Sequence, residues 1–139
     1  MLTDAHVKNL VRFINEDKTA VDFLFRGKNQ TAEQFIAFDE AARRFGFKGR
    51  YECLYVKSHC DQAESYLREA EQLDPLIKNS EAELAKPDLS PDSRKFAEET
   101  LARWMTLKKS YMRGPAEDVE VFRPHREAYQ AAVKKAQGP

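Results

Sequence analysis

The residues best suited to chemistry lie in one short segment, where Cys53, His59 and Cys60 occur near two glutamates. Thiolate, imidazole and carboxylate groups are the usual protein ligands of zinc and related metals. On a helix, however, His59 points about 100° away from Cys60, and the chain has no CxxC, HxxxH or ExxH spacing. Cysteine on an inward helix face more commonly serves as a small core residue. We therefore expect no metal or other cofactor, and a thiol or metal protein using Cys53, His59 and Cys60 is our third functional hypothesis.

Enzymatic chemistry has little support in the rest of the chain. The three histidines, His6, His59 and His125, have no catalytic motif around them. The nucleophile-elbow, P-loop and dinucleotide-binding glycine patterns are absent, and there are only five glycines. Neighbouring acidic residues such as Asp39 and Glu40 face different directions on a helix and do not converge on one substrate. We expect a protein without enzymatic activity.

A segment that mixes basic and aromatic residues is the strongest candidate for binding. It spans residues 43–57, and its candidate contacts are Arg43, Arg44, Phe47, Lys48, Arg50, Tyr51, Tyr55 and Lys57. Such residues could hold phosphates while stacking on bases, or could bind an acidic surface of another protein. Residues 61–74 then carry five carboxylates against one arginine, Arg68. This dipolar arrangement favours protein recognition over nucleic-acid binding.

The overall composition supports the same choice. The 139 residues include 23 Lys plus Arg and 23 Asp plus Glu, so the net charge is zero and does not attract nucleic acids or anionic membranes. No apolar run approaches the roughly 20 residues that a membrane-spanning helix needs, and the first 13 residues lack the apolar core of a signal peptide. We expect a cytoplasmic protein with reduced cysteines and no membrane partner.

A long central helix is predicted for residues 51–73, which contain neither Pro nor Gly. Small and apolar residues recur there at alternating spacings of three and four, which places them on one face of a helix: Cys53, Val56, Cys60, Ala63, Leu67 and Ala70. This narrow face could pack against another helix of the same chain. It could also pack against the same helix of a second subunit, so a homodimer through residues 51–73 is an open alternative.

The remaining elements are predicted from capping signals and helical periodicity. Thr3, Thr19 and Thr31 each stand where an N-cap is expected, which predicts helices over residues 3–16, 20–26 and 31–45. Asp74 and Pro75 mark either a kinked continuation of the central helix or the start of a new one. Two further helices are predicted over residues 90–112, with Trp104 on the inner face, and 124–137. The alternating residues 119–122 are predicted to be an extended connector.

These elements predict an all-α fold, a single-domain helical bundle of about five main helices with a long central helix and a helical hairpin. The one domain, residues 1–139, divides into a short-helix subcluster (1–50), a long helical hairpin (51–113), and a connector plus C-terminal helix (114–139).

Residues 2–47 resemble the leader domain of certain bacterial peptide precursors. The matching features are an amphipathic first helix, then Thr31, Glu33 and Phe35, and then Ala42 and Gly46-Phe47. In that family the segment is a helical docking module for modifying enzymes. The resemblance covers a third of the chain and implies a helical protein-binding segment.

Together these observations predict a small non-enzymatic protein-binding module of the adaptor, chaperone-like, immunity or inhibitor type. It would act through the basic and aromatic residues of the 43–57 segment. The alternative is a nucleic-acid-associated regulator that uses the same segment.

Overall fold

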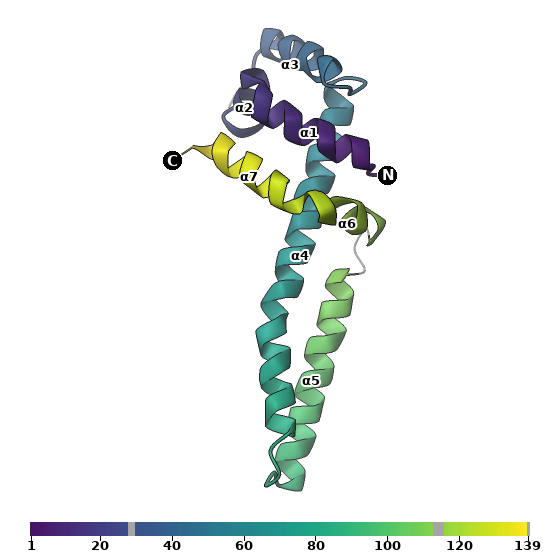
Figure 1. Ribbon diagram of the computed structural model, residues 1–139, viewed down its shortest axis with the longest axis vertical. Helices are drawn as coiled ribbons and strands as arrows, with labels where there is room; N and C mark the ends of the chain where they lie inside the picture. The colour runs from purple at the N-terminus through teal and green to yellow at the C-terminus, as the bar shows by residue number, and fades with distance from the viewer. Residues whose placement is uncertain (28–29, 113–115, 139) are drawn as a thin grey trace.

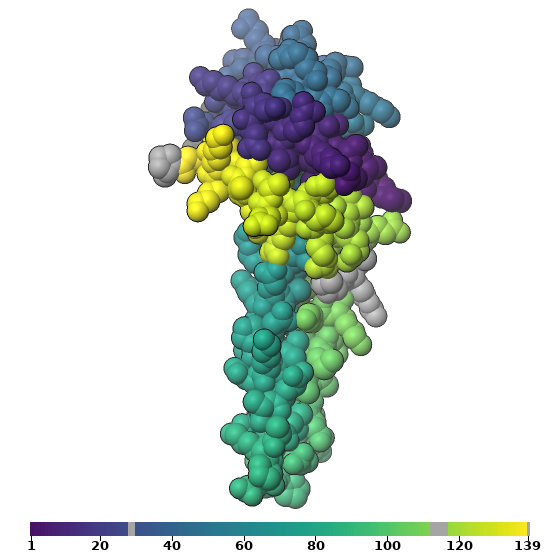
Figure 2. Space-filling model, in the orientation of Figure 1, coloured from purple at the N-terminus to yellow at the C-terminus, as the bar shows by residue number. Residues whose placement is uncertain are grey.

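The computed structural model describes residues 1–27, 30–112 and 116–138. These residues form seven α-helices and one turn of 3₁₀ helix, with no strand among them. The helices make two parts: a head of short helices at one end and a long two-helix hairpin that projects from it (Figures 1 and 2). The predicted all-α fold with a long central helix and a hairpin is confirmed.

The first three helices follow their capping residues. Helix α1 (Asp4–Glu16) begins after Thr3, whose hydroxyl accepts a hydrogen bond from the backbone N–H of His6 while the His6 ring accepts one from Thr3. Helix α3 (Ala32–Arg44) begins with the same reciprocal arrangement between Thr31 and Gln34. Helix α2 (Lys18–Phe25) starts two residues earlier than predicted, because Asp17 and not Thr19 provides its N-cap.

The central helix is longer than predicted. Helix α4 (Arg50–Leu84) has 35 residues and passes through Pro75, so residues 76–84 belong to it and do not form a separate helix. Its stripe of small residues is buried, and from Cys53 to Leu67 it belongs to the same core cluster as residues of α1, α3, α6 and α7. The stripe therefore packs within the chain, the first of the two arrangements expected for it, and a homodimer through residues 51–73 would have to use another face of this helix.

The hairpin consists of the second half of α4 and helix α5 (Pro91–Met112), which run antiparallel (Figure 1). Ser90 caps α5, accepting a hydrogen bond from the backbone N–H of Ser93. An ion pair of 2.6 Å between Lys108 and Asp74 joins the two helices. Trp104 is only half-buried.

The C-terminal segment differs from the prediction. Residues 119–122, predicted as an extended connector, belong to helix α6 (Ala116–Phe122), which leads through a 3₁₀ turn (Arg123–His125) into α7 (Arg126–Gln137). The buried residues Val119 and Phe122 are three apart, which is a helical spacing, and the half-exposed Val121 only imitates a strand pattern. Helices α6 and α7 pack on α1 and α4. The two ends of the chain therefore build one head together.

An aromatic cluster holds the short helices of the head together. The ring of Phe13 lies 4.8 Å from that of Phe45 and 5.7 Å from that of Phe38, and Phe38 stacks on Phe23 at 3.9 Å. Aromatic pairs at such distances add to the hydrophobic gain of burial. This cluster fixes α3 against α1 and α2, and so sets the place of the loop that enters α4. Within the described ranges, no helix has the length and apolar character needed to cross a membrane.

Candidate functional site

The junction between α3 and α4 is organised by Asp39. One carboxylate oxygen accepts a hydrogen bond of 2.8 Å from the backbone N–H of Arg50, and the other accepts one of 3.0 Å from the Arg43 side chain. These two bonds hold the pKa of Asp39 below its ordinary value, and the bond from the Arg50 backbone has the larger effect. Gly49 has a positive φ of 156°, and a Cβ there would lie 2.8 Å from Asp39. Glycine thus lets the carboxylate reach the first turn of α4.

The side chains beside this junction form an exposed mixture of apolar and basic groups. Tyr51 is 74% exposed, Ile36 55% and Phe35 37%. The Arg50 guanidinium lies 4.8 Å from the centre of the Tyr51 ring and 5.8 Å from that of Phe35, and it donates a hydrogen bond to the Tyr51 hydroxyl. We call this region, made of Phe35, Ile36, Arg43, Arg50 and Tyr51, the α3–α4 surface.

Only part of the predicted 43–57 segment belongs to this surface. Arg43, Arg50 and Tyr51 do, and the exposed Lys48 lies in the adjoining loop. Phe47 does not: it is 3% exposed and its ring packs 6.3 Å from that of Phe13, so its prediction as a partner contact is wrong. The hydrophobic core takes this side chain because the loop folds back beneath α1.

The other predicted contacts are held by the head. Arg44 forms an ion pair of 3.7 Å with Asp17 of the α1–α2 turn. Lys57 pairs with Asp61 one turn further along α4 and lies 5.1 Å from the centre of the Phe25 ring. Tyr55 is the last of these predicted contacts. Its hydroxyl accepts a hydrogen bond of 2.9 Å from the Met1 amino group, and the centre of its ring lies 4.0 Å from that of His59.

The weak metal candidates do not converge. Cys53 and Cys60 are fully buried, and burial raises the pKa of each thiol to about 12. His59 reaches a different neighbour, with Nδ1 2.6 Å from the Asp118 carboxylate on α6. Over the described residues, no three His, Cys, Asp or Glu side chains lie close enough to hold a metal ion.

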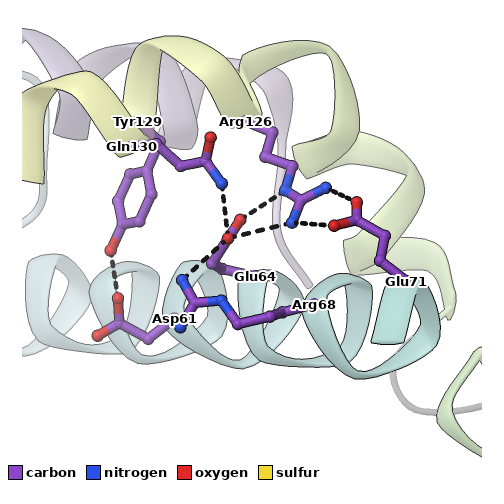
Figure 3. Close-up of polar contacts among 7 residues, drawn as sticks. All are labelled: Asp61, Glu64, Arg68, Glu71, Arg126, Tyr129 and Gln130. Carbon is purple, nitrogen blue, oxygen red and sulfur yellow. Dashed lines mark hydrogen bonds and ion pairs between the residues drawn. The ribbon is translucent and has the colours of Figure 1, made fainter. Parts of the chain in front are cut away.

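A second polar cluster joins α4 to α7 and centres on Glu64 (Figure 3). Its carboxylate accepts hydrogen bonds of 2.8 and 3.2 Å from Arg126, one of 2.7 Å from Gln130 and one of 3.3 Å from Arg68. Arg126 also binds Glu71. Burial alone would raise the pKa of Glu64, but the hydrogen bonds from Arg126 and Gln130 outweigh it and leave the pKa below its ordinary value.

This cluster is suited to structure and not to catalysis. A carboxylate that is ionised at neutral pH and bonded to three side chains has no proton to give and little capacity to accept one. In the sequence Glu64 was noted only as a carboxylate near Cys60 and in the acidic segment 61–74, and its contact with Arg126 was not predicted, because the two residues are 62 positions apart and no local motif connects them. One signal could have suggested the contact: Glu64 directly follows Ala63 of the inward stripe, so its carboxylate lies close to the buried face of α4 and needs a partner there.

Comparisons of the chain with models of known protein families, with curated proteins and with solved structures found no match. The resemblance of residues 2–47 to a peptide-precursor leader domain is thus not supported by a family match.

Proposed function

We propose that this chain is a non-enzymatic protein-binding module and that it contacts its partner through the α3–α4 surface. The observation that carries the proposal is the stack of the half-buried Arg50 against the exposed rings of Tyr51 and Phe35. Aromatic and arginine side chains dominate the binding energy of protein interfaces. Here they are already held in place by one another and by Asp39, so binding would immobilise few additional rotamers.

The charges around the surface favour a protein over a nucleic acid. Of the cations in the 43–57 segment, Arg43, Arg44 and Lys57 each have a carboxylate within 4 Å. A phosphate chain would have to compete with these carboxylates, whereas nucleic-acid binding draws its affinity from unpaired positive charge. An interface that combines an apolar centre with a few compensated charges is typical of protein recognition.

Site-specific photo-crosslinking in extract from the native host tests the proposal. A crosslinking phenylalanine analogue replaces Tyr51 in one sample and the exposed Met105 of α5 in a control sample. We expect one protein to be captured from position 51 and not from position 105. Its identity then comes from mass spectrometry, and the purified partner is used for titration.

The titration compares two variants with two matched controls. Arg50→Glu and Tyr51→Ser should each raise the dissociation constant at least tenfold, about 1.4 kcal/mol. Arg94→Glu and Met105→Ser, which change exposed α5 residues in the same way, should leave it within twofold. Equal effects of all four variants, or capture from position 51 of RNA or DNA in place of protein, would overturn the proposal.

A further inference from the structure

The hairpin buries little of its apolar surface. Among the described side chains of α5, Ala97 alone is buried, although the helix has 22 residues. Four larger side chains on its inner side are only half-buried: Leu101, Trp104, Leu107 and Tyr111. Helices in proteins owe most of their stability to the packing of such a face. The second half of α4 provides only one neighbouring helix, and Figure 2 shows the hairpin projecting clear of the head.

One side of the hairpin carries an open groove. Asn79, Ser80 and Glu83 of α4 and Ser93, Ala97 and Thr100 of α5 line it. Phe96, which is 71% exposed, stands at its edge. Leu76 is 39% exposed and precedes Asn79 and Ser80 by three and four residues, which places it on the same face of α4. The groove thus combines small and polar side chains, including the carboxylates of Glu83 and Asp92, with the large apolar side chain of Phe96.

We propose that a second copy of this chain covers the groove, so that two hairpins pack into a four-helix bundle. The large apolar residue at the edge of each groove, Phe96, would enter the groove of the other copy between Ser80 and Ala97. The same residues serve both sides of such a twofold contact, because an isologous interface is self-complementary.

The charges of the hairpin indicate how the two copies lie. From residue 69 to 84, α4 carries five carboxylates and one cation, Lys78. Helix α5 carries five cations and three carboxylates. A twofold axis along the hairpin places α4 of each copy on α5 of the other, so opposite charges meet. An axis across the hairpin would place α4 on α4 and bring like charges together. The two heads therefore lie at the same end of the bundle.

A contact along the whole length of α5 would be large enough for a stable dimer. Helix α5 is about 33 Å long at 1.5 Å per residue, and two adjacent helices present a face about 18 Å wide. Stacking two such faces buries about 600 Å² on each copy, or about 1,200 Å² in total. This value lies at the lower end of the range for specific interfaces.

Sedimentation of the purified chain at about 100 μM tests the association. The monomer mass is 16.1 kDa, and we expect a species of twice that mass. Phe96→Glu should raise the dissociation constant of the dimer at least a hundredfold, because each substitution occurs twice in the interface. Met105→Glu is the control: Met105 follows Phe96 by nine residues and so lies on the opposite face of α5, and its variant should remain a dimer.

The circular dichroism of each variant verifies that it is folded. A wild-type chain that sediments as a monomer, or a Phe96→Glu variant that dimerises as tightly as the wild type, would overturn the proposal.

A spin label at the end of the hairpin tests the arrangement. Asp88→Cys places a reactive thiol in the exposed α4–α5 loop, while Cys53 and Cys60 are buried. With both heads at one end, the two labels should lie within about 25 Å of each other. Hairpins that point in opposite directions would separate them by more than about 35 Å, roughly the length of α5. The longer distance would contradict the charge argument.

Discussion

Replacing Arg126 by glutamine should destabilise the head strongly, because this side chain is the main link between α7 and the buried face of α4. Its guanidinium donates two hydrogen bonds to Glu64 and binds Glu71 as well (Figure 3). The side chain of Arg126 is only 20% exposed to solvent and that of Glu64 only 10%. Water can therefore replace the lost bonds only in part.

The expected loss is about 2–3 kcal/mol in the free energy of unfolding. Removing one partner of a buried ion pair usually costs about 3–5 kcal/mol. Here the loss is smaller, because Gln130 and Arg68 continue to donate to Glu64. Glu71, whose side chain is 55% exposed, adds little.

Urea denaturation followed by circular dichroism measures this free energy, and Arg68→Gln is the matched control. Arg68 binds the same carboxylate, but its side chain is 63% exposed and its one bond is 3.3 Å long, so its loss should cost less than about 0.5 kcal/mol. A double-mutant cycle with Glu64→Gln should give a coupling energy of about 1.5–2.5 kcal/mol for Glu64 and Arg126.

The pH dependence gives an independent measure of the same contact. The folded state lowers the pKa of Glu64, so the stabilisation is complete above the ordinary value of 4.5 and is lost as the pH falls through the lower folded-state pKa. The difference between wild type and Arg126→Gln should therefore shrink in acid. Equal losses for Arg126→Gln and Arg68→Gln, or a difference that does not change between pH 7 and pH 3, would refute the reasoning.

Three further predictions concern the core and the hairpin. At pH 8, Cys53 and Cys60 should react with a disulfide reagent only as fast as the protein unfolds, since burial raises both pKa values to about 12; rapid labelling of the native protein would contradict this. Phe38→Ala should cost about 3–5 kcal/mol in urea denaturation, and the exposed Ile36→Ala less than about 0.5 kcal/mol. Pro75→Ala should stabilise the hairpin by about 1–3 kcal/mol, because alanine restores the backbone N–H that proline lacks and with it one helical hydrogen bond. Thermal unfolding followed by tryptophan fluorescence measures this gain, and an unchanged unfolding temperature would contradict the prediction.

The parts of the fold that could be predicted are those with local causes. Thr3 and Thr31 mark the starts of α1 and α3 because a capping box involves residues only three apart. The 51–73 stripe follows from a repeat along one helix. Helix α6 could not be recognised, because the alternation of Val119 and Val121 suits a strand as well as a short helix. Its conformation depends on contacts with α1 and α4, which lie far away in the sequence.

The candidate surface shows the same limit. Arg50 and Tyr51 were predicted from composition, and both are on the α3–α4 surface. Phe35 and Phe47 look alike in the sequence, but tertiary packing exposes the first and buries the second. Periodicity within one helix cannot decide this, because the neighbours that cover Phe47 come from other elements. The Glu64–Arg126 contact was beyond prediction for the same reason.

The closure of the head by both ends of the chain also has a consequence for how the protein folds. The hydrogen bond from Leu2 to Asp118 spans 116 residues, and the one from Arg26 to Ala136 spans 110. Contacts within the hairpin join residues that are much closer in sequence, so α4 and α5 can pair while the head is still open. Their pairing shortens the path between the two ends and lowers the entropy cost of joining them. During synthesis, only the part of α1 that packs on α6 and α7 must stay uncovered until those two helices emerge.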